Sequence, residues 1–244
     1  MSKKIGILGG DLRISKLTKM LINDGHSVEV DIENADIIIA GVPLKEDIVK
    51  LEEVFNKISG KIFVAGKISK EIYELADKNN VKVIDVLEDE EVVVLNTIPT
   101  AEGALQVAME EGEITLHGSN CLVIGYGRIG KILSKMLCGI GANISVAARK
   151  KEDLATIEAI GYNKIDIGVL NNELEKYDFI FNTAPAMVID KDRIDILKKE
   201  CVIIDLASAP GGVDFEVAKE KKIKAILALR TSWKSSAIIS SKVY

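Results

Sequence analysis

The chain has 244 residues, 48% of them hydrophobic, and a formal net charge of −5. This length suffices for one large domain or two small ones with a sizeable core. The acidic balance and the lack of a long basic run argue against nucleic acid as the main partner. No apolar run approaches the roughly 20 residues of a membrane span, and no signal peptide precedes the first apolar segment. We therefore expect a cytoplasmic protein that does not enter a membrane.

The content of cysteine and histidine limits the chemistry further. Cys121, Cys138 and Cys201 all lie in apolar contexts, which predicts buried, free thiols in a reducing compartment. The chain has only two histidines, His26 and His117, and it contains no CxxC pair. A metal site built from these residue types is therefore not expected.

Residues 1–85 alternate between short apolar segments and amphipathic segments, which is typical of an α/β domain with a parallel sheet. The glycine turn at residues 6–11 lacks the GxGxxG pattern, and Asp11 would repel a pyrophosphate. We therefore expect a Rossmann-like domain that does not bind the cofactor. The first expected strand begins at residue 4, and the other expected strands span 26–30, 35–40, 61–65 and 81–85. The expected helices span 12–24, 46–58 and 69–79.

The second half of the chain repeats this alternation. The acidic run at residues 88–91 is typical of a solvated loop, and a helix from about residue 100 to 111 should cross to the second domain. The expected strands that follow lie at 121–124, 144–147, 164–165, 178–182, 201–206 and 223–228, and the helices at 129–140, 151–159, 190–199 and 214–221. We predict two Rossmann-like, doubly wound parallel-sheet domains with a cleft between them. The predicted boundaries are 1–98 for a substrate or partner domain, 99–114 for the crossover helix, 115–229 for the nucleotide-binding domain and 230–244 for the tail.

The most specific motif follows the apolar segment 121–124 and reads Gly-Tyr-Gly-Arg-Ile-Gly. Its glycines have separate physical roles: Gly125 permits a tight turn, Gly127 lets the backbone approach a pyrophosphate, and Gly130 lets the helix pack close to the strand. The free N–H groups at the helix start would face the negative charge. A tight turn without a ligand is the alternative. In this strand–helix–strand context, the motif predicts a dinucleotide site formed by Gly125, Tyr126, Gly127, Arg128, Ile129 and Gly130.

The end of the next strand bears on the choice of nucleotide. An NAD site usually places a carboxylate about 20 residues after the glycines, where it binds the ribose 2′-hydroxyl. This chain has Arg149, Lys150 and Lys151 there, and the first carboxylate is Glu152. Cations can pair with a 2′-phosphate, so we predict NADP, with NAD as the alternative. A merely solvated basic loop would be slightly disfavoured by the helix dipole.

Three polar clusters, at residues 96–102, 182–185 and 205–212, are expected at the carboxyl ends of strands, where open α/β sheets bind ligands. The Asn-Thr-x-Pro pattern at 96 and 182 suggests two turns that each expose an amide at the cleft, although plain turn chemistry explains the same residues. The candidates are Asn182, Thr183 and Asp205 for the cofactor, Asn96 and Thr97 for the substrate, Glu102 in the first turn of the crossover helix as a general base, and His117 as a general acid or base.

Five stretches of the chain together resemble one known family. They are Gly9-Gly10-Asp11 with Arg13, NTIPTAEGALQVAM (96–109), TLHGSNCLVIGYGRIGK (115–131), GANISVAARKKEDLA (141–155) and IIDLASAPGGVDFEVAKEKKIKA (203–225). At these residues the sequence resembles the family formed by the A subunit of dipicolinate synthase in spore-forming bacteria. The resemblance covers most of the chain in the right order.

The resemblance implies NAD(P)-dependent oxidation of a dihydrodipicolinate-type precursor to pyridine-2,6-dicarboxylate during sporulation, together with a flavoprotein-like second subunit. The three glycines of the motif would bind the cofactor. Because the substrate is a small dicarboxylate, Arg13 and backbone N–H groups at Gly211 and Gly212 are candidate anchors. One alternative is a non-catalytic NAD(P)-binding partner or sensor subunit. Another is a dehydrogenase for shikimate-like acids, whose Lys/Asp pair we do not find in the first domain. The sequence has no oligomerisation signature, which leaves a homo-oligomer open.

The sequence departs from the resemblance after Leu229. A Gly-Leu-Pro-Gly turn and a closing helix would be expected there, but the chain reads RTSWKSSA and ends at Tyr244. One extra base near codon 230 converts codons for the expected GLPGKVA into codons for these eight residues. We therefore interpret residues 230–244 as an aberrant, frameshifted tail, poorly ordered and accompanied by loss of stability or activity. A divergent natural tail is the alternative, and resequencing the locus distinguishes the two.

Overall fold

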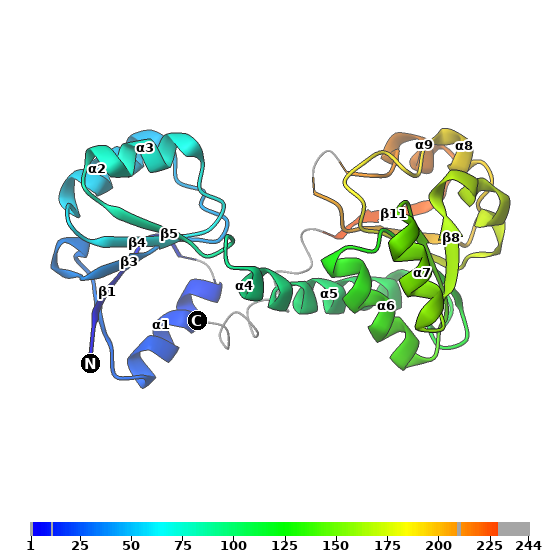
Figure 1. The fold of residues 1–244 in the computed structure, drawn as a ribbon, viewed down its shortest axis with the longest axis horizontal. Coiled ribbons are helices and arrows are strands. Elements are labelled where there is room, and N and C mark those ends of the chain that lie inside the picture. Colours follow the sequence, from blue (N-terminus) through cyan, green and yellow to red (C-terminus); the bar gives the residue numbers. More distant parts are fainter. Residues whose placement is uncertain (1, 11, 209–210, 229–244) are drawn as a thin grey trace. The chain divides into compact units, whose positions relative to one another are not determined.

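The computed structural model describes residues 2–10, 12–208 and 211–228 (Figure 1). The described residues form two compact units that divide between Asn96 and Thr97. Each unit contains its own sheet, and all strand pairs in both sheets are parallel. The predicted fold class, two Rossmann-like α/β domains, is thereby confirmed. The predicted tail at 230–244 and the side chain of Asp11 lie outside the described residues.

The first unit has a five-stranded sheet in the order β2-β1-β3-β4-β5. Its strands are β1 (Lys4–Ile7), β2 (Ser27–Glu29), β3 (Ile37–Ile39), β4 (Ile62–Ala65) and β5 (Lys82–Asp85), and its helices are α1 (Leu12–Asn23), α2 (Ile48–Lys57), α3 (Lys70–Lys78) and the short 3₁₀ helix η1 (Ile32–Asn34). Asp47 caps α2 by accepting the Lys50 N–H at 2.9 Å. The helix then buries Leu51 and Phe55 on one face. The Phe55 ring packs edge-on against the ring of Phe63 in β4, and the two ring centroids are 5.0 Å apart.

The segment between the sheets differs from the prediction. Residues 90–95 form α4 (Glu90–Leu95), and α5 (Thr97–Glu111) follows directly. The expected acidic loop is therefore partly helical, because the Asp89 side chain accepts the Glu91 N–H and carboxylates are favourable at a helix N-terminus. Asn96 ends α4 in a helical conformation, so the predicted turn after a strand at this position is wrong. Pro99 fits in the first turn of α5, where its missing N–H costs no hydrogen bond.

One described stretch, Glu90–Glu111, has the length and apolar composition of a membrane-spanning helix, with a mean hydropathy of 1.2. Core helices of globular domains meet the same criterion. Here the buried positions of α5, Ala101, Ala104, Val107 and Ala108, belong to a hydrophobic cluster shared with Leu133 and Leu137 of α6 (Arg128–Ile140). These contacts explain the apolar composition of α5 as one face of a packed core.

The second unit has a six-stranded sheet in the order β11-β10-β9-β6-β7-β8. Its central strands are buried on both faces, which explains why they are continuous apolar runs rather than alternating ones. The predicted helix at 190–199 is shorter, and a 3₁₀ segment at 167–176 was not predicted. The elements are β6 (Asn120–Ile124), β7 (Asn143–Ala148), α7 (Lys151–Ala159), β8 (Asn163–Asp166), η2 (Ile167–Lys176), β9 (Phe179–Asn182), α8 (Lys191–Ile194), β10 (Val202–Asp205), α9 (Phe215–Glu220) and β11 (Lys224–Leu227).

The cysteines match the prediction in part. All three are free, and Cys121 and Cys201 are buried, but Cys138 is exposed. Leu133 and Leu137 of α6 face the core, and Cys138 is turned away from it by one helical position. The prediction of burial is therefore wrong for Cys138.

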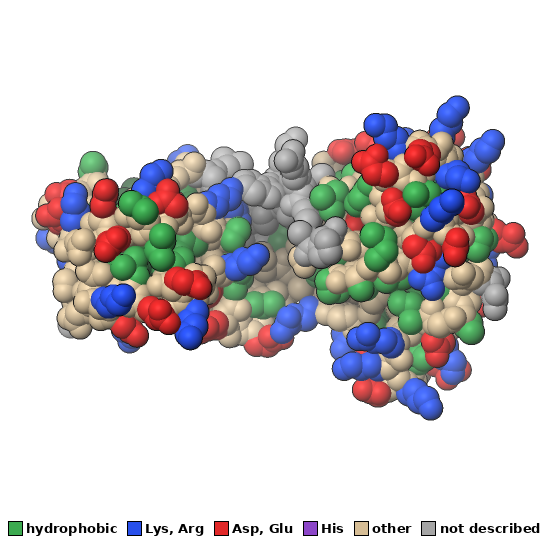
Figure 2. All heavy atoms as spheres, turned by 90° about the horizontal axis from the view of Figure 1, so that it is seen from above, with side chains coloured by type: hydrophobic (Ala, Val, Ile, Leu, Met, Phe, Trp, Pro, Cys, Tyr) green, Lys and Arg blue, Asp and Glu red, His purple; other side chains and the backbone are tan. Residues whose placement is uncertain are grey.

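Acidic and basic side chains are interspersed over the face of each unit that Figure 2 shows. The exposed ion pairs of the second unit have the same mixed character, for example Lys164 with Glu158 and Lys221 with Asp195. Such a surface is typical of a protein whose charges serve solvation.

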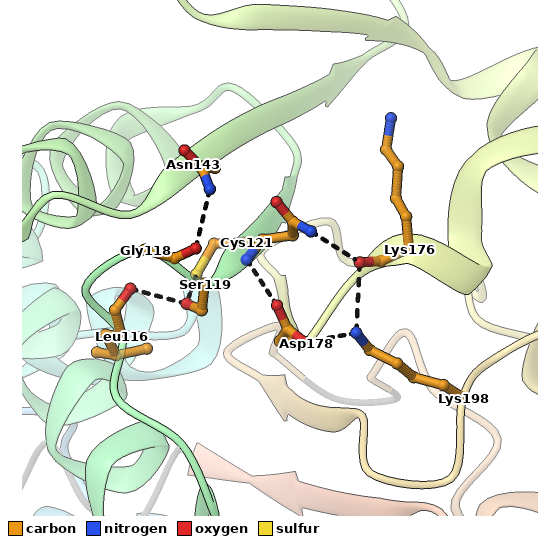
Figure 3. Close-up of polar contacts among 9 residues, drawn as sticks. Leu116, Gly118, Ser119, Cys121, Asn143, Lys176, Asp178 and Lys198 are labelled. Atoms are coloured by element: carbon orange, nitrogen blue, oxygen red, sulfur yellow. Dashed lines mark hydrogen bonds and ion pairs between the residues drawn. The ribbon is translucent and has the colours of Figure 1, made fainter.

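A network of hydrogen bonds and an ion pair lies at the amino-terminal edge of the second sheet (Figure 3). Asp178, just before β9, accepts the backbone N–H of Asn120 at 2.7 Å and forms an ion pair with Lys198. The Lys198 ammonium also donates to the carbonyl of Lys176. The Asp178 carboxylate thereby ties the starts of β6 and β9 to the segment before β10.

Replacing Asp178 with asparagine is expected to lower the free energy of unfolding by about 1–3 kcal/mol, because the ion pair is lost and a charged acceptor is replaced by a neutral amide. Denaturant unfolding of the wild type and the variant measures this difference. An unchanged transition midpoint would show that the network contributes nothing to stability.

Candidate functional site

The order of strands in the second sheet reverses at β6. Strands β7 and β8 follow on one side of β6, while β9, β10 and β11 follow on the other side. Open α/β sheets bind ligands at such a switch point, beyond the carboxyl ends of the strands. The register pairs Ile124 at the end of β6 with Ala147 and with Asn182, so the turns after these strands begin at one edge.

The glycine motif forms the turn at this edge, between β6 and α6. Gly125 has a φ of +97°, and a Cβ there would lie 2.5 Å from the Thr183 hydroxyl. A Cβ at Gly130 would lie 2.1 Å from the carbonyl oxygen of Gly125, so only glycine allows α6 to approach the strand. These distances support the steric roles predicted for both residues.

Gly127 differs from the other two glycines of the motif, because no described residue other than its chain neighbours lies within 4 Å of the position of its Cβ. It is the N-cap of α6, and no side chain caps the helix there. A 13-residue helix directs its positive dipole end toward this backbone. This arrangement suits a pyrophosphate.

The other residues of the motif frame the turn. Arg128 is exposed, whereas Ile129 is partly buried against the core cluster. Tyr126 is partly buried too, and the Lys131 ammonium lies 5.3 Å from its ring centroid. Burial, with the nearby Asp153 carboxylate, raises the pKa of the Tyr126 hydroxyl above its ordinary value.

The predicted cations lie at the start of α7. Arg149 and Lys150 follow β7, Lys150 is the N-cap of α7, and its side chain makes no capping hydrogen bond. Arg149, Lys150 and Lys151 are all exposed, and within the described chain their charged groups take part in no hydrogen bond or ion pair. Three unpaired cations beside an uncapped helix N-terminus suit an anionic group.

Asn182 and Asp205 are both fully buried at the ends of β9 and β10, where they hydrogen bond to one another at 2.8 Å. Their polar groups are also engaged with the backbone of the loops that follow. The structure does not test direct contact with a cofactor, which stays a prediction for both residues. Thr183 is partly buried, and its hydroxyl donates to the Ile124 carbonyl at 2.9 Å.

The backbone N–H groups at Gly211 and Gly212, predicted to anchor the substrate, have partners within the protein, and the anchoring role stays a prediction. The Gly211 N–H donates to the Ser208 carbonyl at 3.0 Å, and the Gly212 N–H donates to the Asp205 carboxylate at 2.9 Å. Both donors are therefore used inside the protein. Both glycines are also buried.

The two predicted acid–base residues lie in different places. His117 precedes β6 and lies beside Gly141 at the C-terminal end of α6, so it is at the amino-terminal edge, opposite the glycine turn. Glu102 is exposed in α5, in its second turn rather than its first. The end of α5 contacts the start of β11 through Lys224 and Glu111, so α5 runs antiparallel to the strands. The N-terminal half of α5, with Glu102, therefore lies toward the carboxyl edge, and we retain only Glu102.

Three predicted substrate residues lie outside the glycine turn. Arg13 is in the first turn of α1, after the exposed Gly9 and Gly10, and it belongs to the first unit. Asn96 is exposed at the end of α4, and Thr97 is buried at the start of α5. Their predicted roles stay predictions.

The sequence analysis missed Asp85 at the carboxyl end of β5. Its carboxylate accepts the N–H groups of Lys67, Ile68 and Leu87 at 3.1, 2.7 and 2.8 Å. Asp85 thereby holds the turn after β4, where Lys67 has a φ of +62°. Asp85 could have been found from the sequence in the same way as Asp205, because both are aspartates at the end of a predicted strand.

Comparison with known proteins extends these observations. The family model of the NAD-binding domain of D-isomer specific 2-hydroxyacid dehydrogenases matches residues 99–219. The A subunit of dipicolinate synthase from Bacillus subtilis (strain 168) is 29% identical over 206 residues, which cover 84% of this chain and 69% of that protein.

Two solved structures agree with this relationship. The A subunit of dipicolinate synthase from Bacillus halodurans has a TM-score of 0.84 at 27% identity, over 99% of this chain and 96% of that one. The A chain of the dipicolinate synthase of Bacillus subtilis has a TM-score of 0.80 at 25% identity, over 100% of this chain and 96% of that one.

The fold, the glycine turn and the matched family model together define a dehydrogenase-like protein with a domain for a nicotinamide dinucleotide. Within that class, the resemblance to the A subunit of dipicolinate synthase is confirmed by sequence and by structure over most of the chain.

Proposed function

We propose that this protein is the NADP-dependent oxidoreductase subunit that forms dipicolinate from a dihydrodipicolinate-type precursor during sporulation, in the cytoplasm. The observation that supports a dinucleotide most strongly is the glycine turn. A Cβ would clash at Gly125 and Gly130, whereas no described residue beyond the chain neighbours of Gly127 crowds its Cβ position at the N-cap of α6. The residues present therefore fit a pyrophosphate at this turn.

Residues at the carboxyl edge of the second sheet would bind the cofactor and take part in the reaction. The start of α6 binds the pyrophosphate, and Arg149 with Lys150 binds the ribose 2′-phosphate. A bound nicotinamide would supply the hydride acceptor for this oxidation, and the precursor would also lose a proton as its ring becomes aromatic. Glu102 is the candidate to accept this proton.

Replacing Arg149 with aspartate is expected to reverse the preference for NADP over NAD, with a change in the affinity ratio of about 10- to 100-fold. The new carboxylate repels a 2′-phosphate and accepts a hydrogen bond from a 2′-hydroxyl, and hydrogen bonds to charged groups contribute about 1.5–3 kcal/mol. Calorimetric titration with both dinucleotides measures the ratio. Lys199→Asp is the matched control, because this exposed lysine precedes β10 at the opposite edge. A wild type that prefers NAD would contradict the assignment of the cations.

A non-catalytic NAD(P)-binding or sensor subunit is the second candidate function. It is favoured by the position of His117, which leaves Glu102 as the one predicted acid–base group on the side of the glycine turn. Reduction of NADP at 340 nm by the purified protein with dihydrodipicolinate and its partner subunit distinguishes the two. Turnover that is lost in Glu102→Gln supports the oxidoreductase, and binding without turnover supports the sensor.

The proposed partner is a flavoprotein-like second subunit, and a homo-oligomer is the other assembly to consider. Size-exclusion chromatography after co-expression is expected to show a joint peak for the two subunits. Separate elution at micromolar concentration would contradict a stable complex.

A further inference from the structure

Two polar side chains are fully buried side by side at the carboxyl edge of the second sheet. Asn182 ends β9 and Asp205 ends β10, and the register of the two strands pairs them directly. The Asn182 amide donates to Asp205 Oδ1 at 2.8 Å. A buried carboxylate is costly unless donors satisfy it, so the other contacts of this pair matter.

Each member of the pair also holds the loop that follows its own strand. Asn182 accepts the Ala184 N–H at 3.2 Å and donates to the Ala184 carbonyl at 3.1 Å. Asp205 accepts the Ala207 N–H on Oδ1 at 3.0 Å and the Gly212 N–H on Oδ2 at 2.9 Å. Only an ionised carboxylate offers acceptors on both oxygens and no donor, which explains an aspartate here.

The two loops are also joined to each other. The N–H groups of Val188 and Ile189 both donate to the Gly212 carbonyl, at 3.0 and 2.8 Å. A Cβ at Gly212 would lie 2.1 Å from the Asn182 amide nitrogen and 2.7 Å from the Ala186 carbonyl oxygen. The backbone at Gly212 and at Ala186 therefore lies close to the buried pair.

These loops belong to the half of the sheet that lacks the glycine turn. A dinucleotide spans two mononucleotide-binding halves at the switch point. The first half, β6 to β8, has the glycine turn and the cations Arg149 and Lys150 for the adenosine side. The loops after β9 and β10 therefore face the nicotinamide half.

We propose that Asn182 and Asp205 are positioning residues, which fix the backbone at Ala184, Ala207 and Gly212, beyond β9 and β10, in the arrangement that receives the nicotinamide half of the cofactor. This role rests on the proposed dinucleotide function. The pair acts through the loop backbone, because its own polar atoms are engaged and have no exposed surface.

The variant Asp205→Asn tests this role. Its amide keeps the volume but offers one acceptor oxygen, and its N–H₂ group would face a backbone N–H at Ala207 or Gly212. Calorimetric titration with NADP and, separately, with 2′,5′-ADP gives the readout. We expect NADP to bind about tenfold more weakly or worse, and 2′,5′-ADP to bind as it does to the wild type.

Asp178→Asn is the matched control, because Asp178 accepts a backbone N–H and pairs with a side chain at the opposite edge of the same sheet (Figure 3). It should reduce stability without changing NADP affinity. The double variant Asn182→Asp with Asp205→Asn provides a second test, because it restores a bond between the two side chains but not both backbone contacts. We expect it to regain stability relative to Asp205→Asn, with NADP affinity still low.

Each result decides between the explanations. Wild-type NADP affinity in Asp205→Asn or in the double variant would overturn the positioning role and leave the proposed function intact. An equal loss of NADP and 2′,5′-ADP affinity would also overturn the role, because the effect would then be general damage to the fold. A wild type that binds neither compound would instead contradict the proposed function itself.

Discussion

Replacing Gly130 with alanine is expected to abolish dinucleotide binding and to lower the free energy of unfolding by about 3 kcal/mol or more. The new Cβ would lie 2.1 Å from the Gly125 carbonyl oxygen, and 3.0 Å from its carbon. These are backbone atoms of the turn, so α6 must move away from β6 and take its N-terminal N–H groups with it. Denaturant unfolding and titration with NADP measure the two effects, and the affinity should fall by about 100-fold or more.

The same helix contains its own control. Gly139 lies in the last turn of α6 and has no atom within 4 Å of its Cβ position. Gly139→Ala should therefore stabilise the protein by about 0.5–1 kcal/mol and leave dinucleotide binding unchanged. If Gly130→Ala behaved like Gly139→Ala, the close approach of helix and strand would not be required.

The second large effect concerns the reactivity of the thiols. Burial raises the pKa of the Cys121 thiol to about 11 and that of Cys201 to about 12. Because a raised pKa keeps the thiol protonated, the reactive thiolate at pH 8 is scarcer than for an ordinary cysteine by about two orders of magnitude for Cys121 and about three for Cys201. We expect an aromatic disulfide to react quickly with Cys138 alone in the native protein, and with all three cysteines after unfolding.

The variant Cys138→Ser makes this measurement specific. It should remove the fast phase and leave the slow phase, which reports opening of the core of the second unit. Fast reaction of two thiols in the native wild type would show that the burial of Cys121 or Cys201 is wrong.

Much of the fold could be predicted because its strands are buried on both faces. Segments such as residues 121–124 and 178–182 are short, continuous apolar runs, and helices of a different period separate them. The glycine motif was informative for a steric reason. Gly125 and Gly130 occupy positions where a Cβ would meet Thr183 or the backbone, and such constraints leave a fixed spacing in the sequence.

The rest depended on tertiary contacts. The Asn-Thr-x-Pro pattern occurs twice, but at 96 it joins two helices and at 182 it ends a buried strand. Turn-forming residue types do not distinguish these two cases. At residue 96 the helical structure depends on the packing of α5 against the core. The position of His117 follows from the sequence alone, since a residue that precedes a parallel strand lies at the edge opposite the glycine turn.

The sequence also could not show what Asn182 and Asp205 do. Both were correctly placed at strand ends, but their burial and their shared hydrogen bond require β9 and β10 to be neighbours in register. Likewise, Gly211 and Gly212 have the composition of an anion-binding loop, yet their N–H groups are consumed by Ser208 and Asp205. The partners of backbone donors follow from the folded loop rather than from residue type.

Calorimetric titration of the purified wild type with NADP, with 2′,5′-ADP as a competitor, tests the central claim most directly. We predict one dinucleotide bound per chain, displaced by 2′,5′-ADP, with binding lost in Gly130→Ala and kept in Gly139→Ala. No binding of NADP or NAD at millimolar concentration to the folded wild type would contradict a dinucleotide site at the glycine turn.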